Sequence, residues 1–339
     1  MFFITSARLL CSLLLSVAAL AVNAAETLDL PRHVIFTSDP QFPWTDNSDS
    51  GVDESASERD KRSRWLIETQ YSDVASFRKN FSRDPNHIPV MINGDMTAFG
   101  HRGERATTRS ILDAQLGVIY DYGLGNHDYQ NNINDCGFPE NNCAAGSVND
   151  LKERYWGKVD MDLAARSEGR TKVFYGSLAY SKSVGDVHLV QLNNEPTYSV
   201  SFASGFPLSR INFEINNALD WLERDLQKAR SQGKIILLNM HKPDRWQGNS
   251  KQIARFKKMV ELYQVTAVFA GHFHNNPGKY TDWRTHEYFG DIPVFLSGGA
   301  SNQTYLIASF AADRKSFNVH QVSNNNWPSR KVIATVPVR

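Results

Sequence analysis

The feature that most constrains this 339-residue chain is a short apolar segment that ends in a polar turn. Residues 117–122 are rich in β-branched and aromatic side chains, which is typical of a buried strand. The turn after this segment contains Gly125, Asn126, His127 and Asp128. Ligands of open α/β sheets bind at the carboxyl ends of the strands, so this segment predicts a binding site at a sheet edge.

Four more predicted strands end in side chains of metal-ligating types. These side chains are Asp39 with Gln41, then Asp95, then His241, and finally His272 with His274. Carboxylate, imidazole and amide ligands suit borderline-hard divalent cations such as Mn²⁺, Fe²⁺ or Zn²⁺. Together with Asn126 there are seven candidates, which is too many for one tetrahedral ion. They predict two ions about 3.5–4 Å apart, bridged by Asp95, which stands alone on its turn.

The spacing of apolar residues predicts alternating strands and helices, with strands crowded into the last third of the chain. Strands are expected at residues 33–37, 88–92, 171–180, 187–192, 234–238, 265–270, 293–296, 304–310, 316–322 and 332–336. Helices are expected at residues 58–80, 105–116, 148–156, 211–229 and 253–263, and the acidic, Ser-rich residues 46–60 are expected to form a mobile surface loop. Residues 26–339 are interpreted as one α/β domain with two sheets between helical layers.

The N-terminus has the pattern of a cleaved signal peptide. Arg8 precedes an apolar run over residues 9–22, and small residues up to Ala25 follow it. The alternative is a transmembrane anchor, but about 20 residues are needed to span a bilayer. We therefore expect residues 1–25 to be removed and the protein to be secreted or periplasmic, without a stable membrane anchor.

The charge balance gives no support to a nucleic-acid partner. The sequence has 37 basic and 36 acidic residues, and removal of Arg8 with the signal peptide leaves 36 of each. Two cysteines, Cys136 and Cys143, remain once Cys11 has left. In an oxidising compartment such a close pair predicts a disulfide. The alternative, a metal site at these cysteines, has no obvious third ligand nearby.

The order of the polar clusters resembles the calcineurin-like metallophosphoesterase superfamily. The matching motifs are Asp-x-Gln from Asp39, Gly-Asp at Asp95, Gly-Asn-His-Asp from Gly125, a lone His at His241, and Gly-His-x-His ending at His274. The resemblance implies a four-layer α/β/β/α sandwich with two mixed β-sheets. It also implies a metal-dependent phosphoester hydrolase, either a phosphodiesterase or a phosphomonoesterase.

Carried over residue by residue, the resemblance also implies roles for the site residues. The first metal would bind Asp39, Gln41, Asp95 and His274, and the second would bind Asp95, Asn126, His241 and His272. His127 would donate a proton or orient the phosphate, with Asp128 tuning it. A hydroxide generated between the two cations would attack phosphorus in line, and His127 would protonate the departing alkoxide.

One residue departs from the family pattern. The first motif usually ends in His, and here that position is Gln41. An amide oxygen is a weaker and harder ligand than imidazole, so we expect a looser first site that favours Mn²⁺ or Fe over Zn²⁺. In the alternative, Gln41 does not touch the metal and admits a water.

Other residues have weaker assignments. His101 and Arg102 lie in a loop after Asp95 and could contact phosphate, whereas Asp128 could instead cap a helix. The aromatic ring of Trp44 is expected to pack over the first strand rather than stack on substrate. The substrate stays open among phosphomonoesters, cyclic nucleotides, nucleotide diesters and phospholipid head groups. The alternative function is a catalytically silent binding protein with the same fold.

Overall fold

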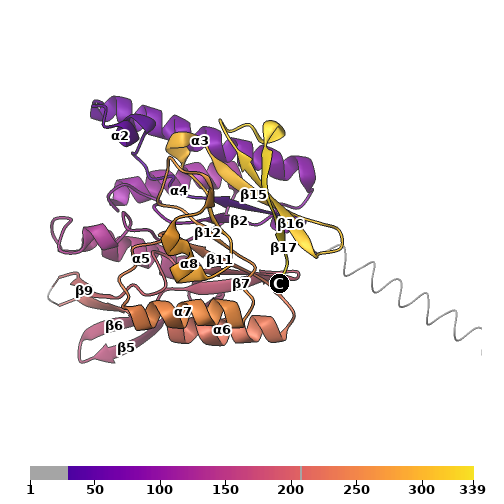
Figure 1. Ribbon diagram of the computed structural model, residues 1–339. Helices are drawn as coiled ribbons and strands as arrows, with labels where there is room; N and C mark the ends of the chain where they lie inside the picture. Colours follow the sequence, from indigo (N-terminus) through magenta and orange to yellow (C-terminus); the bar gives the residue numbers. More distant parts are fainter. Residues whose placement is uncertain (1–29, 207) are drawn as a thin grey trace, which may run out of the picture.

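The computed structural model describes residues 30–206 and 208–339 (Figure 1). The expected signal peptide, residues 1–25, lies outside this described part of the chain. Within the described part, no helix is both long and apolar enough to cross a membrane.

The first large sheet is mixed and has six strands in the order β17-β16-β15-β1-β2-β3. Strands β1, β2 and β3 are parallel, whereas β15, β16 and β17 join them as antiparallel neighbours. The strands are β1 (His33–Thr37), β2 (Val90–Ile92), β3 (Asp121–Tyr122), β15 (Tyr305–Phe310), β16 (Ser316–Val322) and β17 (Lys331–Pro337). Its outer face packs on α3 (Ala56–Phe81), α4 (Arg102–Leu116) and α5 (Asn142–Tyr155) through one apolar cluster.

The second large sheet is also mixed and has seven strands in the order β13-β14-β12-β11-β8-β7-β4. The strands are β4 (Asp160–Met161), β7 (Tyr180–Val184), β8 (Val187–Gln191), β11 (Ile235–Met240), β12 (Ala267–Ala270), β13 (Gly278–Tyr280) and β14 (Val294–Leu296). A second apolar cluster joins its outer face to α6 (Leu219–Ser231), α7 (Ser250–Leu262) and α8 (Trp283–Phe289) (Figure 1).

The two large sheets pack face to face. A third apolar cluster fills the space between them, and at its centre the rings of Phe36 from β1 and Phe269 from β12 stack with centroids 3.5 Å apart. Helices outside and sheets inside make the predicted four-layer α/β/β/α arrangement. Burial of both faces explains why β11 and β12 contain almost only apolar residues.

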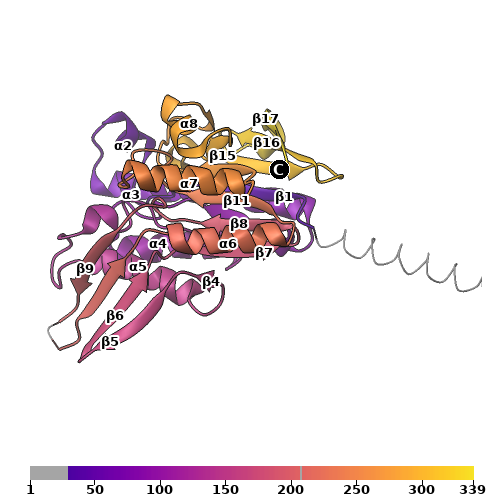
Figure 2. The same ribbon diagram turned by 60° about the horizontal axis from the view of Figure 1, so that its bottom comes forward.

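A third sheet of four strands extends away from the sandwich (Figure 2). Its order is β5-β6-β10-β9, with β5 (Ala164–Glu168), β6 (Thr171–Gly176), β9 (Val200–Ser204) and β10 (Ile211–Ile215). The predicted helix over residues 211–229 is therefore wrong in its first part. Residues 211–215 alternate in burial, with Phe213 and Ile215 buried, and the helix begins only at Leu219.

The expected surface loop at residues 46–60 is also wrong. Thr45 caps α2 (Asp46–Ser50) and Ser55 caps α3, each with a reciprocal capping box. The serines that suggested a loop thus take part in helix caps: Ser48 in the capping box of Thr45, and Ser55 as the cap of α3. The strand expected at residues 117–122 is shorter than predicted, because α4 continues to Leu116 and only Asp121–Tyr122 pair with β2.

The remaining short elements are 3₁₀ turns, namely η1 (Pro85–His87), η2 (Gln130–Asn132), η3 (Ala300–Asn302) and η4 (Trp327–Ser329). Cys136 and Cys143 form the predicted disulfide in the segment after β3. Strands β1, β2 and β3 run parallel in one large sheet, as do β11 and β12 in the other. All the predicted ligands follow the carboxyl ends of these five strands.

Candidate metal centre

The turns that carry the predicted ligands have unusual backbone conformations. Asp39, Gln41, Asp95 and His272 have φ values of 51°, 41°, 49° and 73°. Non-glycine residues in the left-handed region are uncommon, and each costs on the order of 1–3 kcal/mol. Such strain is frequent at functional sites, and four of the seven predicted ligands carry it.

Glycines next to these ligands let the turns approach each other closely. A Cβ atom on Gly125 would lie 2.2 Å from Asp95 Oδ1, and one on Gly94 would lie 2.9 Å from His241 Cβ. Backbone hydrogen bonds fasten the turns together: Asp39 N donates to Gly94 O and Gln41 N donates to Asp95 O, at 3.1 and 3.0 Å. The first and second motifs therefore form one rigid unit.

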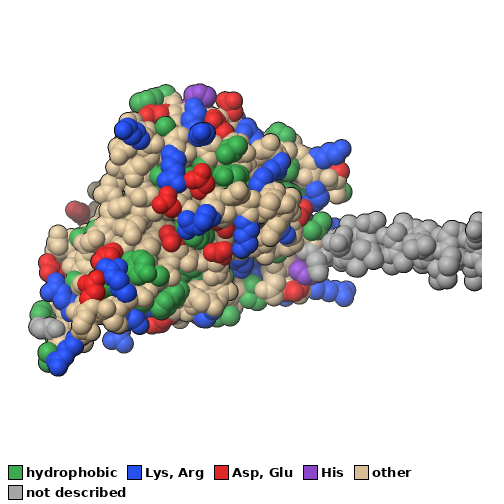
Figure 3. Space-filling model, turned by 90° about the horizontal axis from the view of Figure 1, so that it is seen from below, with side chains coloured by type: hydrophobic (Ala, Val, Ile, Leu, Met, Phe, Trp, Pro, Cys, Tyr) green, Lys and Arg blue, Asp and Glu red, His purple; other side chains and the backbone are tan. Residues whose placement is uncertain are grey.

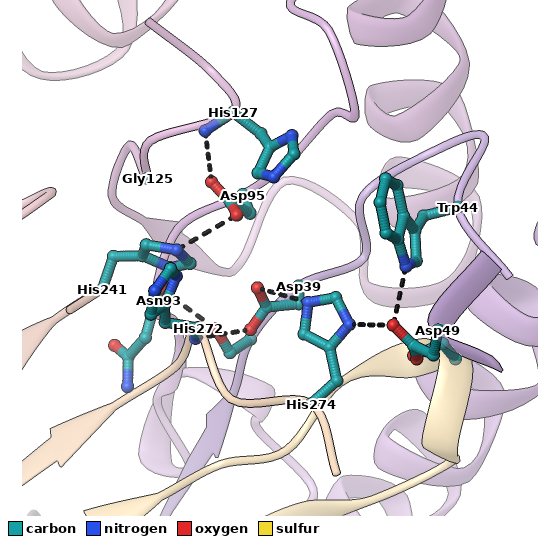
Figure 4. A network of polar contacts seen from close by, with 12 residues as sticks. Asp39, Trp44, Asp49, Asn93, Asp95, Gly125, His127, His241, His272 and His274 are labelled. Atoms are coloured by element: carbon teal, nitrogen blue, oxygen red, sulfur yellow. Dashed lines mark hydrogen bonds and ion pairs between the residues drawn. The ribbon is translucent and has the colours of Figure 1, made fainter. Parts of the chain in front are cut away.

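We call Asp95, Asn126, His241 and His272 the second half-site. His241 is fully buried, and its Nε2 lies 3.0 Å from Asp95 Oδ2 (Figure 4). The same nitrogen lies 3.0 Å from Asn126 Oδ1. Its Nδ1 bonds Asn93 O at 2.9 Å, which leaves Nε2 directed at the carboxylate. Ligand atoms of Asp95, His241 and His272 all lie within 4.8 Å of one another, so these residues could hold one ion.

We call Asp39, Gln41 and His274 the first half-site; the sharing of Asp95 with this half-site stays a prediction. His274 Nε2 lies 3.1 Å from Asp39 Oδ1, and the backbone N–H of His272 donates to Asp39 Oδ2 at 3.1 Å. Gln41 is 1% exposed, and its Oε1 has no hydrogen-bond partner among the described residues. A buried, unpartnered oxygen on the same turn as Asp39 fits a cation, because leaving such an acceptor unpaired costs about 1–3 kcal/mol.

The charges of the site are tightly coupled. Burial opposes the charge of His241, but Asp95 and Asp39 outweigh it and raise the pKa of His241 to about 9. Burial likewise opposes charge on Asp95, yet His241 and His127 lower the pKa of Asp95 to about 2. Burial and the positive His241 lower the pKa of His272 to about 4. Without metal, the second half-site is thus an Asp95–His241 ion pair beside a neutral His272.

His127 lies above this ion pair. Its backbone N–H donates to Asp95 Oδ1 at 2.9 Å, and its Nδ1 lies 2.8 Å from Ala98 O. A carbonyl only accepts, so Nδ1 carries the hydrogen and Nε2 is the ring nitrogen left to exchange a proton.

Asp128 joins two turns instead of capping a helix. Its carboxylate accepts from the backbone N–H groups of Met96, Thr97 and Gly125 and from the Thr97 hydroxyl, at 2.9–3.0 Å. Burial and the nearby Asp95 raise the pKa of Asp128 to about 7. Asp128 thus holds the turn after β2 against the turn that carries His127, and its tuning of His127 stays a prediction.

The loop predicted to contact phosphate borders the site. Ala98 in this loop holds His127, and the loop ends at His101, which precedes α4. The exposed His101 has its Nδ1 2.8 Å from Glu104 Oε1, and Arg102 is exposed in the first turn of the helix. Phosphate contact by His101 and Arg102 stays a prediction.

Two residues next to the first half-site were not predicted as part of it. Asp49 of α2 lies 2.7 Å from His274 Nδ1 and also accepts from Trp44 Nε1 at 2.7 Å. The Trp44 ring lies 5.6 Å from the His127 ring and 6.2 Å from the His274 ring, centroid to centroid (Figure 4). Trp44 therefore borders the site. The capping residue Thr45 is the sequence signal that could have predicted a helix, rather than a mobile loop, in this segment.

Comparison with known proteins identifies the class. A sequence model of the calcineurin-like phosphoesterase family matches residues 32–276, more than half of the chain. The chain belongs to this family, which agrees with its mixed sheets and with the order of its motifs. No curated protein gives a significant match.

Two solved structures are similar to the chain. GAP50, the anchor in the inner membrane complex of Plasmodium, is 11% identical, with 91% of this chain and 89% of that chain covered and a TM-score of 0.49. Vps29 of Chaetomium thermophilum is 8% identical, with 91% and 97% covered and a TM-score of 0.28.

Proposed function

We propose that this protein is a two-metal phosphoester hydrolase. The observation that carries the proposal is that two sets of candidate ligands meet where parallel strands of the two large sheets end, with Asp95 bonded to residues of both sets. The turn of Asp39 and Gln41 is bonded to the turn of Asp95, and Asp95 is in turn paired with His241. A carboxylate with two oxygens, placed between two ligand sets, can bridge two neighbouring cations.

The first cation would be held by Asp39, Gln41, Asp95 and His274, and the second by Asp95, Asn126, His241 and His272. When bound, a pair of such cations lowers the pKa of water and neutralises charge on phosphate oxygens. The amide oxygen of Gln41 is a hard ligand, so we propose Mn²⁺ or Fe in preference to Zn²⁺.

His127 supplies the proton for the leaving group. Ala98 O fixes its Nδ1–H, so the proton transferred to the departing oxygen comes from Nε2. The hydrogen bond from the His127 backbone to Asp95 holds the residue over the centre. A positioned general acid contributes roughly 10²–10⁴-fold to the rate.

The test is hydrolysis of p-nitrophenyl phosphate and bis-p-nitrophenyl phosphate by the mature protein with added Mn²⁺. His127→Ala is expected to lower kcat by about 10²–10⁴-fold. The matched control is His286→Ala, because this histidine lies exposed on α8. Absence of any turnover that depends on both Mn²⁺ and His127 would overturn the proposal and favour a catalytically silent binding protein.

The substrate we propose is a small phosphoester, such as a nucleotide or a phospholipid head group. Basic and acidic side chains are interspersed on the face seen in Figure 3, and the formal net charge is +1. Neither feature favours a nucleic-acid partner. A panel of monoesters and diesters assayed with the same preparation would identify the preferred class.

We also propose that the protein is exported after removal of residues 1–25. The disulfide between Cys136 and Cys143 supports an oxidising compartment. Sequencing the N-terminus of the mature protein should give Glu26 as its first residue. A mature protein that retains Arg8 would contradict export with cleavage.

A further inference from the structure

We infer that Asp49 is a positioning residue of the first half-site, which orients His274 toward its cation. The inference rests on the proposed two-metal function. His274 lies between two carboxylates, with Nε2 3.1 Å from Asp39 Oδ1 and Nδ1 2.7 Å from Asp49 Oδ1. The side chains of His274 and Asp49 are only 11% and 9% exposed, so water competes little for this contact.

The Asp49 carboxylate is itself held by three other donors. Trp44 Nε1 donates to Oδ1 at 2.7 Å, while the Ser301 hydroxyl and Asn302 Nδ2 donate to Oδ2 at 2.6 and 3.1 Å. These donors come from the turn after Gln41 and from η3, which are far apart in the sequence. A carboxylate bonded by four donors from three segments is fixed in place, unlike an ordinary surface acid.

A fixed acceptor at Nδ1 determines how His274 can bind a cation. With Nδ1–H donated to Asp49, the Nε2 lone pair is the one left for the metal. A carboxylate partner also makes the imidazole a stronger ligand, and loss of such partners typically costs 10–100-fold in metal affinity. The two half-sites differ here, because Nδ1 of His241 bonds the neutral carbonyl of Asn93.

The charge of Asp49 offsets the weak ligand at position 41. Gln41 gives the first half-site an uncharged amide oxygen where the family pattern has an imidazole. Asp49 strengthens the other neutral ligand of the same half-site, His274, and brings a negative charge close to the cation. The same carboxylate accepts from Trp44, so it also positions the aromatic ring that borders both His274 and His127.

The experiment compares Mn²⁺ binding by calorimetry for the wild type, Asp49→Ala, Asp49→Asn and Asp46→Asn. Asp46 is the matched control, because it lies on the same short helix and pairs with the exposed Arg62. We expect two Mn²⁺ per chain for the wild type and for Asp46→Asn. Asp49→Ala should keep one ion and bind the other 10–100-fold more weakly. Asp49→Asn keeps a hydrogen-bond acceptor and should lie between the two.

A spectroscopic measurement separates positioning from general stability. In the Zn²⁺-loaded wild type, ¹⁵N shifts should show His274 protonated at Nδ1 and metal-bound at Nε2. In Asp49→Ala the Nδ1–H signal should exchange faster or shift, while His241 keeps its wild-type signals. If Asp49→Ala does not fold, Asp49→Asn carries both measurements.

The outcomes distinguish this inference from the function on which it rests. A wild type that binds fewer than two Mn²⁺ would overturn the two-metal function and the role of Asp49 with it. A wild type that binds two, together with Asp49 variants that bind two with unchanged affinity and unchanged His274 signals, would overturn the role of Asp49 alone.

Discussion

The two half-sites are built in different ways, although we propose that Asp95 belongs to both. In the second half-site, His241 is fully buried and its Nδ1 is held by the backbone carbonyl of Asn93, next to a core strand. In the first, His274 is held by Asp49, a side chain of the short helix α2. The second half-site is therefore supported by the core, and the first by segments at its periphery.

This difference indicates which residues of the site can change without disturbing the fold. The candidate ligands of both half-sites follow strand ends, but the second half-site is also held by the core carbonyl of Asn93, so a change there disturbs the sandwich itself. The first half-site depends on Trp44, Asp49 and the η3 turn, which can change without loss of a strand. Gln41, which replaces the usual His of the family pattern, also lies in the first half-site. The departure from the pattern is therefore in the half-site that can change without loss of a strand.

The largest effect is expected from Asp95, the residue that we propose as common to both half-sites. Asp95→Asn removes the shared charge and leaves the buried His241 without its ion-pair partner. We expect both cations to bind more weakly and kcat/KM to fall by more than about 10³-fold, since each cation supplies several kcal/mol in such sites. Metal content and hydrolysis of bis-p-nitrophenyl phosphate measure the two effects.

The control is Asp53→Asn, at an exposed position after α2. If Asp95→Asn removed only one ion and left the other with wild-type affinity, Asp95 would belong to one half-site and the comparison would fail.

The next effect comes from the glycines that bring the turns together. A Cβ on Gly125 would lie 2.6 Å from the Asp95 backbone nitrogen, which cannot move away without disturbing β2. A Cβ on Gly271 would instead meet the Ser38 hydroxyl at 1.8 Å. Gly125→Ala should lower the free energy of unfolding by about 1–3 kcal/mol. It should also weaken the binding of the cation at the second half-site.

Thermal unfolding and metal titration test this contrast. Gly271→Ala should be improved in part by a second change, Ser38→Gly, which removes the nearer of the two clashing side chains and leaves Asp39 Oδ2 at 2.8 Å. The two glycine variants could instead lose the same free energy of unfolding, with no recovery from Ser38→Gly. That result would show that both half-sites are equally rigid.

The sequence predicted the candidate ligands of both half-sites, but not the residue that supports the first, for a physical reason. A run of buried apolar residues followed by a polar turn is a local signal, and all seven candidate ligands follow such runs in the two large sheets. Asp49 has no such signal, because its role depends on contacts with His274, Ser301 and Asn302 that lie more than 200 residues away. The acidic, Ser-rich composition around it was interpreted as a loop, although Thr45 and Ser55 cap helices there.

Prediction of the fold from the sequence was limited in the same way, because only strands with a strong local signal were found. The apolar strands of the two large sheets were predictable, because burial on both faces leaves a continuous apolar run. The third sheet was missed, because β5 and β9 expose much of their surface and carry few large apolar residues. In β10, the apolar residues Ile211 and Ile215 also fit helical spacing, so the adjacent helix was extended over a strand.

A smaller effect is expected from Gln41→His, which restores the usual ligand of the family pattern. An imidazole at this position should tighten Zn²⁺ binding at the first half-site on the order of 10- to 100-fold, the range typical of changes around a metal site. Mn²⁺ should gain less, because it prefers oxygen ligands. Competition between Zn²⁺ and Mn²⁺, followed by calorimetry, measures the shift.

The matched control is Gln70→His, at a buried glutamine of α3 that donates to Thr304 O. An unchanged preference in Gln41→His would mean that Gln41 does not touch the cation and that a water completes the first half-site.

The smallest effect is the pH dependence of cation binding, and it compares the two half-sites directly. Burial opposes a proton on His274, but Asp39 and Asp49 raise the pKa of His274 well above its ordinary value, while the pKa of His241 is about 9. Each histidine must lose one proton before its Nε2 can bind a cation. The affinity of each half-site for a cation should therefore rise about tenfold per pH unit, since one pH unit corresponds to about 1.4 kcal/mol. At the second half-site this rise should end near pH 9, where His241 has lost its proton.

The stability of the metal-free protein should follow the opposite course. The folded protein holds a proton on His241 more tightly than the unfolded chain does, so this contribution is complete below pH 6.5 and is lost as the pH rises through about 9. His272, whose pKa is about 4, should release no proton on binding. Calorimetry of Mn²⁺ binding in buffers with different ionisation enthalpies counts the protons released. Two protons per chain at pH 7.5 would support one in each half-site, whereas none would contradict the ion pairs that hold both histidines.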